Sequence, residues 1–156
     1  MPTDDESDYL ERFGLFFEMA GGNRTAGRMF GWLLISEPPD QSITELAEVL
    51  QVSKASVSTV IRQLQQAGFV ERVPAPGTRQ HRYQVKADGW LQIAQSRIGF
   101  LSAGRDLSQL GLKIIGDDPA RGERLGEFAD FLAFMEKEYG DELVRRWQRY
   151  REEGNA

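Results

Sequence analysis

The chain has 156 residues, a formal net charge of −5 and no cysteine, so it is long enough for one domain with helical extensions and too short for two full domains. The lack of cysteine excludes a disulfide framework and thiolate chemistry. The N-terminus is acidic and the longest apolar run, "WLLI", is far too short to span a bilayer, which predicts a cytoplasmic protein without a membrane partner.

The first predicted element is a helix over residues 8–20, "DYLERFGLFFEMA". Leu10, Phe13 and Phe17 recur at helical spacing and define an apolar side. The glycines of "GGN" end the helix because glycine weakens helical backbone. We expect this apolar side to form part of a homodimer interface.

A second helix is predicted over residues 24–36, "RTAGRMFGWLLIS". Asn23 is the expected N-cap, and the prolines of "EPPD" end the helix. Gly27 and Gly31 are four residues apart, so they share a face and allow another helix to pack closely.

Two short helices joined by a tight turn are predicted next. In "SITELAEVLQV", Ser42 or Thr44 caps a short helix. After the turn, Ser53 caps a second helix. Its apolar residues recur at i, i+3, i+4 and i+7 and define one core-facing stripe, which consists of Val57, Val60, Ile61 and Leu64. This arrangement is a helix-turn-helix.

The opposite face of the second helix is polar and carries no carboxylate, although the chain is rich in carboxylates. Such a face can enter the DNA major groove without repulsion from phosphates, and its short hydroxyl groups can approach base edges closely. The DNA-binding candidates on this helix are Ser53, Lys54, Ser56, Ser58, Thr59, Arg62 and Gln63. An ordinary solvated helix face is the alternative.

A β-hairpin is predicted after the helix-turn-helix. "FVERV" and "RQHRYQV" are strand patterns, and "PAPGT" is a turn pattern between them. This order predicts a mainly α fold with a small β-hairpin (α+β), a winged helix-turn-helix with N- and C-terminal dimerisation helices. Arg79, His81 and Arg82 are candidates to contact the minor groove or its phosphates, although strand alternation lets only some of them point outward.

The charge distribution supports a nucleic-acid partner. Residues 1–18 carry six acidic residues against one basic residue, whereas residues 51–86 carry six basic residues against one acidic residue, a local net charge of +5. A protein–protein adaptor that reuses the winged helix without touching DNA is the alternative, and it would not need a basic hairpin beside a carboxylate-free face.

Enzyme chemistry has little support in this sequence. His81 is the sole histidine, which excludes a histidine-based triad and a multi-histidine metal site. "GGNRTAGR" lacks the spacing and the lysine of a phosphate-binding loop. Asp117 and Asp118 are adjacent carboxylates, but "DDPA" is typical of a helix start. The sequence therefore predicts no catalytic residue, no metal and no cofactor.

The C-terminal part is predicted to be helical. A long amphipathic helix over 89–115 is followed by "GDDP" and by an apolar stripe that continues past Gly140. We assign this stripe to a homodimer interface, with packing inside one subunit as the alternative. Its residues are Leu125, Phe128, Leu132, Met135, Tyr139, Leu143 and Trp147. The predicted organisation is 1–36 for N-terminal helices, 37–88 for the winged helix-turn-helix and 89–156 for C-terminal helices.

Three segments, "GRMFGWLLIS", "LAEVLQVSKASVSTVIRQLQQAGFVERV" and "PGTRQHRY", resemble the MarR superfamily of transcriptional regulators, and in particular its GbsR-type branch. The broader MarR pattern has an acidic-Arg wing motif, for which this chain has "PGTRQHR". The resemblance implies a homodimeric regulator, usually a repressor, that binds a pseudo-palindromic double-stranded DNA operator and often releases it when a small molecule binds.

The GbsR-type resemblance also implies a quaternary ammonium effector such as choline, which needs several aromatic faces around a cation. Most aromatic residues at helical spacing are core residues. Phe128, Phe131 and Phe134 step by three and cannot all serve one packing stripe, and adjacent Phe16 and Phe17 must point different ways. The effector candidates are Phe16, Trp90, Phe100, Phe131 and Phe134.

Overall fold

The computed structural model describes residues 1–74, 77, 80–87, 89–116 and 118–154, with the backbone alone for Trp90, residues 92–97 and Asp141. The chain divides into two units, Met1–Trp90 and Leu91–Ala156. The boundary predicted near residue 88 falls close to this division, and the N-terminal helices belong to the same unit as the winged helix-turn-helix.

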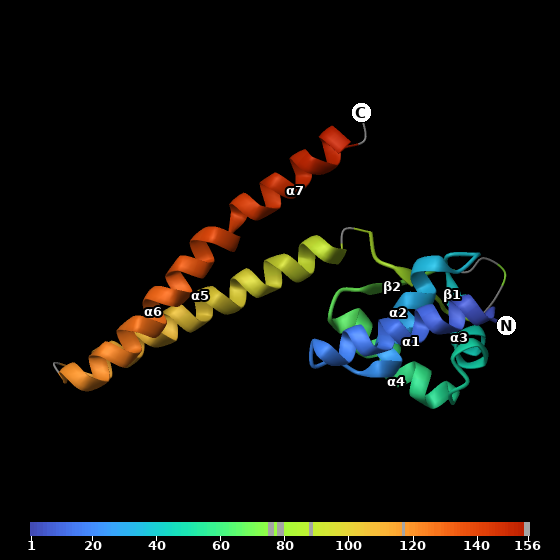
Figure 1. Ribbon diagram of the computed structural model, residues 1–156, viewed down its shortest axis with the longest axis horizontal. Coiled ribbons are helices and arrows are strands. Elements are labelled where there is room, and N and C mark those ends of the chain that lie inside the picture. Colours follow the sequence, from blue (N-terminus) through green and yellow to red (C-terminus); the bar gives the residue numbers. More distant parts are fainter. Residues whose placement is uncertain (75–76, 78–79, 88, 117, 155–156) are drawn as a thin grey trace. The chain divides into compact units, whose positions relative to one another are not determined.

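The first unit contains helices and a small antiparallel sheet (Figure 1). The helices are α1 (Asp4–Met19), α2 (Arg24–Ile35), α3 (Ile43–Leu50) and α4 (Lys54–Gln66). The strands are β1 (Gln41–Ser42), β2 (Val70–Val73) and β3 (Arg82–Val85), in the order β1-β3-β2. The winged helix-turn-helix predicted from the sequence is confirmed, and β1 is an additional strand.

Helix α1 begins four residues before its predicted start because its N-terminus carries a capping box. Thr3 Oγ1 accepts a hydrogen bond from the Glu6 N–H at 3.2 Å, and Glu6 Oε2 accepts one from the Thr3 N–H at 2.7 Å. Asp4, Asp5 and Glu6 lie in the first turn, where negative charge stabilises a helix through its dipole. The acidic N-terminal segment is therefore the first turns of α1.

The apolar side of α1 packs on α2 of the same chain, which corrects the dimer assignment of Leu10. Leu10 is only 2% exposed and belongs to the core. Phe13 and Phe17 are half-buried against the same core, and their ring centroids lie 6.1 and 5.8 Å from that of Phe30. These three side chains are covered without a partner subunit. The large apolar side chains that α1 leaves exposed are Leu15, Phe16 and Met19.

The helix-turn-helix is set by local signals. Ser42 caps α3, Gln51 ends it in the left-handed region at φ 54°, and Ser53 caps α4. The predicted stripe of α4 is buried, as expected for Val57, Val60, Ile61 and Leu64. Gly68, at φ 82°, follows α4 because a left-handed residue is easily accommodated only by glycine.

The sheet is shorter than the predicted hairpin. Strand β2 pairs with β3 from Val70↔Val85 to Val73↔Arg82, and β1 pairs with β3 through Gln41↔Tyr83 and Ser42↔Arg82. His81 precedes the first strand residue, so its predicted position inside a strand is wrong.

The second unit is helical and contains α5 from Leu91 onward (Gly89–Ile115), α6 (Pro119–Tyr139) and α7 (Asp141–Gly154). Asp118 caps α6 by accepting a hydrogen bond from the Arg121 N–H at 3.1 Å. Gly140 separates α6 from α7, so the apolar stripe predicted to run past this glycine is divided between two helices. None of the described helices is long and apolar enough to cross a membrane.

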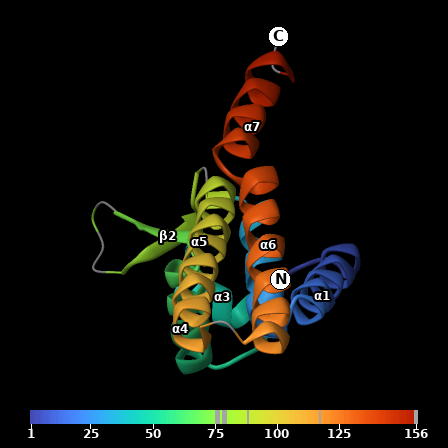
Figure 2. The same cartoon turned by 90° about the vertical axis from the view of Figure 1, so that its left-hand side faces the viewer.

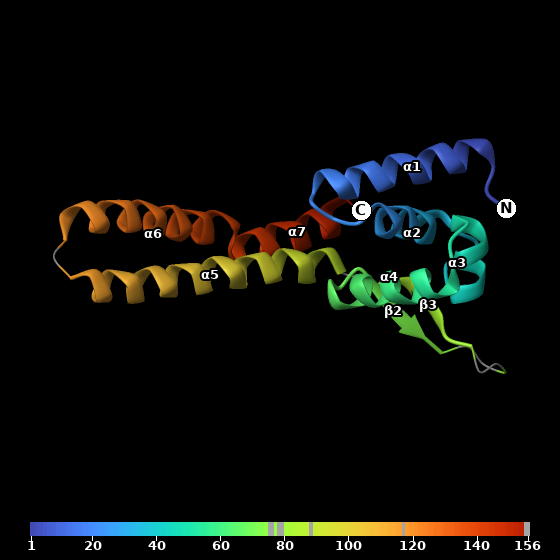
Figure 3. The same ribbon diagram turned by 90° about the horizontal axis from the view of Figure 1, so that it is seen from below.

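Helices α5 and α6 lie side by side and antiparallel (Figures 2 and 3). A Cβ built on Gly111 would lie 2.6 Å from Leu125 Cδ2, and one on Gly104 would lie 2.9 Å from Leu132 Cδ1. Polar contacts also cross this pair, because Glu136 accepts hydrogen bonds from Ser102 Oγ and Arg105 Nη1, both at 2.6 Å. We call α5 from Leu91 onward, together with α6, the helical hairpin.

Candidate nucleic-acid interface

The face of α4 opposite its buried stripe is open to solvent. Burial of Val57, Val60, Ile61 and Leu64 fixes the rotation of the helix, so the remaining positions must point away from the core. Ser58 is half-buried, and the exposed predicted DNA-binding residues of this segment are Ser53, Lys54, Ser56, Thr59, Arg62 and Gln63. The structure therefore brings the predicted α4 residues onto one accessible surface.

Hydrogen bonds hold the short side chains of this surface close to the helix. Ser53 Oγ accepts from the Ser56 N–H at 3.1 Å, and the two hydroxyl groups share a hydrogen bond of 2.9 Å. Thr59 Oγ1 donates to the Ala55 carbonyl at 3.1 Å. These contacts keep the short side chains from projecting away from the helix, so a DNA duplex can approach the backbone of α4.

Arg62 is the long side chain in the middle of this surface. Its Nε donates to the Ser58 carbonyl at 3.2 Å, which orients the side chain along the helix. Its two terminal nitrogens have no partner among the described residues. A guanidinium with free terminal nitrogens can bind a guanine edge or a phosphate through two hydrogen bonds.

The arginines of the first unit differ in whether carboxylates neutralise them. Arg12 pairs with Asp8, while Arg24 and Arg28 pair with Glu11 at 2.7 and 2.9 Å. In contrast, within the described part of the chain no carboxylate lies within ion-pairing distance of Lys54, Arg62 or Arg72. The acidic N-terminal helix thus neutralises α2, and the unpaired positive charge lies on α4 and β2.

Arg72 was missed as a single candidate, although it contributes to the basic count of residues 51–86. It lies on β2, is exposed and pairs in register with Tyr83 of β3. His81 is also exposed, just before β3. Arg79, the third predicted wing contact, lies outside the described residues. Among the described residues, the exposed wing candidates are therefore His81 and Arg72.

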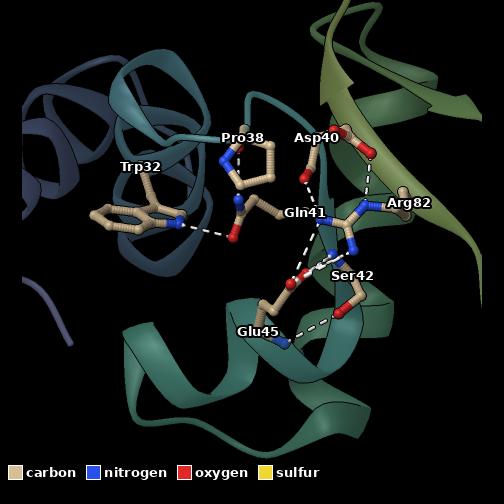
Figure 4. A network of polar contacts seen from close by, with 7 residues as sticks. All are labelled: Trp32, Pro38, Asp40, Gln41, Ser42, Glu45 and Arg82. Carbon is tan, nitrogen blue, oxygen red and sulfur yellow. Dashed lines mark hydrogen bonds and ion pairs between the residues drawn. The ribbon is translucent and has the colours of Figure 1, made fainter.

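The structure removes Arg82 from the set of free wing cations. Its Nε lies 2.5 Å from Asp40 Oδ2 and its Nη1 lies 3.1 Å from Glu45 Oε2 (Figure 4). The side chain is 20% exposed, and its guanidinium contacts Glu45 of α3. Arg82 is therefore paired, and a phosphate would have to displace two carboxylates to bind it.

The ion pairs shift the ionisation of both partners. Burial opposes the charge on Glu45, but hydrogen bonds from Ser42 and the charge of Arg82 outweigh it, so the pKa of Glu45 lies below its ordinary value. Burial likewise opposes the charge on Arg82, but the hydrogen bond to Asp40 and the charges of Glu45 and Asp40 outweigh it and raise the pKa of Arg82. Both groups are charged at neutral pH.

The predicted dimer residues of the second unit fall into two groups. Leu132 is 4% exposed and packs with Leu125 on the glycines of α5, so both are covered inside the helical hairpin. Met135 is half-buried. The remaining members are exposed, and they are Phe128, Tyr139, Leu143 and Trp147. The dimer assignment is thus corrected for Leu125 and Leu132, which have partners in their own chain.

Exposed apolar residues follow both helices of the hairpin. On α5 they are Phe100, Leu107, Leu110 and Ile114, and on one side of α6 they are Phe128, Phe131 and Tyr139, with Met135 between them, whereas the exposed Phe134 lies on another side of α6. At 100° per residue, each row lies roughly 30° to 110° around its helix axis from the residues of that helix that meet across the hairpin. The rotation has the same sense in both helices. Because the helices are antiparallel, equal rotations bring both rows to one side, which we call the apolar face of the hairpin.

Among the described side chains of the second unit, the predicted effector residues form no aromatic cage within that unit. Phe16, Phe100, Phe131 and Phe134 are exposed, and the side chain of Trp90 lies outside the described residues. Phe16 contacts Phe13 and Phe17 of its own helix, with centroids 6.0 and 6.2 Å apart. No ring–ring contact between described residues joins Phe100, Phe131 and Phe134. No group of metal-binding side chains was found in the described part of the chain.

Comparisons with known proteins all match this chain to the same class of protein. A model of the MarR family matches residues 21–81, and a model of MmpR5-like MarR family transcriptional regulators matches residues 88–151. The chain is 38% identical over 146 residues to the HTH-type transcriptional regulator MmpR5 of Mycobacterium tuberculosis, covering 93% of this chain and 88% of that protein. It is 24% identical over 139 residues to the HTH-type transcriptional repressor OpcR of Bacillus subtilis, covering 81% and 74%.

A solved crystal structure of a transcriptional regulator is similar over nearly the whole chain. The TM-score is 0.78 at 37% sequence identity, over 92% of this chain and 99% of that one. This similarity confirms the predicted fold class. The matched proteins are transcriptional regulators, which confirms the prediction that the chain is not an enzyme and disfavours the adaptor alternative.

Proposed function

Because the chain belongs to the MarR family of transcriptional regulators, we propose that it is a homodimeric repressor that binds a pseudo-palindromic DNA operator through α4 and the β2–β3 wing. The observation that carries this proposal is the exposed face of α4. That face has no carboxylate, and its cations Lys54 and Arg62 have no ion-pair partner among the described residues. We also propose that the protein resides in the cytoplasm.

We divide the contacts into two classes by the length and charge of the side chains. Ser56, Thr59, Arg62 and Gln63 are proposed to meet base edges in the major groove, where hydrogen bonds distinguish sequences. Lys54 at the start of α4 and Arg72 on β2 are proposed to meet phosphates, which fix position without reading sequence. Ser53 and Ser58 lie near these contacts, and the Ser53 end of α4 presents backbone N–H groups that favour an anion.

The apolar face of the hairpin supports the homodimer. Transfer of each large apolar side chain from water into an interface contributes roughly 1.5–3 kcal/mol, and a large contiguous apolar face rarely remains open on a monomer. A second copy with the same face would cover it by two-fold symmetry. Two linked recognition helices would then address half-sites about 34 Å apart.

A mobility-shift assay with DNA fragments from upstream of the protein's own gene tests the proposal. We expect a shifted complex that survives excess unrelated DNA. It should weaken steeply as the salt concentration rises, because basic side chains of the protein replace counterions on the DNA phosphates. A reporter gene under the bound fragment tests the sign of regulation, and repression requires lower expression when the protein is present. Absence of any complex at low salt would favour the adaptor.

We also propose a small-molecule effector of the quaternary ammonium class, as the GbsR-type resemblance implies. The supporting observation is that Phe100 and Phe131 leave ring faces exposed on the apolar face of the hairpin, where a second copy would bring further rings. Several aromatic faces around one cation make such a site. Calorimetry with choline and glycine betaine tests it. No heat at millimolar ligand together with unchanged operator binding would leave these rings as interface residues.

A further inference from the structure

We propose that Arg82 is a positioning residue, which holds the root of the wing against the loop before β1 and the first turn of α3 and does not contact DNA. This inference rests on the proposed DNA-binding function. It assigns to Asp40 and Glu45 a role in DNA affinity that their negative charge alone would not suggest.

Arg82 lies at the place in the sheet where the wing begins, so its contacts can affect the position of the wing. Arg82↔Val73 is the last pair of the β2–β3 ladder, so the two arms of the wing leave the sheet at this pair. On its other side Arg82 pairs with Ser42 of β1, in a ladder of only two pairs. Because so few backbone pairs hold β3 to β1, the side-chain contacts of Arg82 add a further connection at the wing root.

The guanidinium contacts both the loop before β1 and the first turn of α3. Its Nη2 donates to the Asp40 carbonyl at 2.5 Å, in addition to the contact of Nε with the Asp40 carboxylate. Its Nη1 reaches Glu45 Oε2 at 3.1 Å (Figure 4). A planar guanidinium with several fixed donors can hold two acceptors in a defined geometry, which an ammonium cannot.

The same carboxylate also caps α3, which couples the wing to the helix-turn-helix. Glu45 Oε2 accepts from the Ser42 N–H at 2.7 Å, and Ser42 Oγ accepts from the Glu45 N–H at 3.2 Å. The neighbouring Gln41 donates to the Pro38 carbonyl at 2.7 Å, and its Oε1 accepts from Trp32 Nε1 at 3.4 Å. The root of the wing is therefore connected to α3 and, through Gln41, to α2.

A direct phosphate contact and a positioning role predict opposite effects of Asp40→Asn. If Arg82 bound a phosphate, removal of the Asp40 charge would free the guanidinium and leave DNA binding unchanged or tighter. If Arg82 positions the wing, the same substitution weakens the contacts of Arg82 with Asp40 and Glu45, which we call the clamp. It then lowers DNA affinity even though it removes a negative charge. The sign of the change separates the two roles.

The experiment compares the full-length parent with Asp40→Asn, Arg82→Lys and Arg82→Gln in a DNA-binding titration over a range of salt. The matched control is Glu48→Gln, which removes one carboxylate from an exposed position of α3 outside the clamp. We expect Asp40→Asn and both Arg82 variants to weaken DNA binding roughly 2- to 30-fold, the size of indirect coupling effects. The salt slope, which is the dependence of the logarithm of DNA affinity on the logarithm of salt concentration, should stay unchanged. Glu48→Gln should bind as tightly as the parent or more tightly.

Hydrogen exchange of the β2 and β3 amides in the free protein supplies a readout that does not depend on DNA. We expect faster exchange in Asp40→Asn and Arg82→Gln than in Glu48→Gln.

Tighter DNA binding by Asp40→Asn, or a salt slope reduced by about one in Arg82→Gln, would overturn the positioning role. Unchanged exchange in both variants would overturn the clamp itself. A parent protein that exchanges as expected but binds no DNA would overturn the proposed function and leave the clamp standing. If Arg82→Gln does not fold, Asp40→Asn decides the question.

Discussion

Gly14 of α1 and Gly27 of α2 pack backbone against backbone. A Cβ built on Gly27 would lie 2.9 Å from Gly14 Cα and 2.8 Å from Phe17 Cβ, distances at which side chains do not fit. The absence of a side chain at these positions lets α1 lie close enough to bury Leu10 in the core. Helix α1 is therefore a structural part of the DNA-binding unit.

Gly27→Val should destabilise the protein. The added side chain meets the backbone of α1, which cannot move aside as a flexible side chain could, so we expect a loss of about 1–3 kcal/mol in the free energy of unfolding. Chemical denaturation followed by circular dichroism measures it. Gly126→Ala is the control, since Gly126 is helical and has open space around its Cβ position, and it should be neutral or slightly stabilising. Equal stability of the two variants would contradict the close packing.

Arg62→Ala should weaken operator binding by about 1–3 kcal/mol and relax specificity at one base position. The reason is that Arg62 presents unpartnered terminal nitrogens in the middle of the α4 surface. Binding to the operator and to single-base variants, compared by fluorescence anisotropy, measures both effects. Arg12→Ala is the matched control, because Arg12 is an exposed arginine paired with Asp8 on α1, and it should bind like the parent. A uniform loss across all sequences would instead assign Arg62 to a phosphate.

Phe128→Asp should dissociate the proposed homodimer. Phe128 lies on the apolar face of the hairpin, and a charge there would lose its water shell without gaining a partner when the second copy docks. Phe134→Asp is the control, since Phe134 is similarly exposed, at 58% against 51% for Phe128, but lies on the side of α6 away from α5. Light scattering that reports a monomer for the first variant and a dimer for the second supports this interface. The same mass for both variants would exclude it.

Glu45→Gln should make stability less sensitive to acid. The pKa of Glu45 is lower in the folded protein than its ordinary value of 4.5, so its ionised form stabilises the fold. This contribution is complete above the ordinary pKa and disappears as the pH falls through the lower folded value. Thermal unfolding between about pH 6 and pH 3 should show a smaller decrease for Glu45→Gln than for the parent. At neutral pH the variant should be less stable.

Glu48→Gln is the control for that measurement, because Glu48 lies on the same helix, is exposed and has no ion pair with a described residue. It should follow the pH dependence of the parent. A parallel decrease for all three proteins would show that the Glu45–Arg82 pair does not contribute to acid sensitivity.

Local signals in the sequence were sufficient to predict most helices and the surface of α4. Caps such as Asn23, Ser53 and Asp118 act within three residues of the helix start, and the apolar period of α4 lies within one short segment. These features depend on neighbours in the chain, so they can be recognised without a fold. The start of α1 was missed although Thr3 and Glu6 form a capping box of the same local kind.

Only the tertiary structure decided which apolar side chains have a partner in their own chain and which cations are free. The period of α1 marks Leu10, Phe13 and Phe17 as an apolar side, but the glycines of α2 determine that this side packs within one chain. Arg82 resembles other basic wing residues in the sequence, yet its partner Asp40 lies 42 positions away. Helical periods and caps are set by interactions over a few residues, whereas ion pairs and buried contacts depend on where the folded chain brings distant residues together.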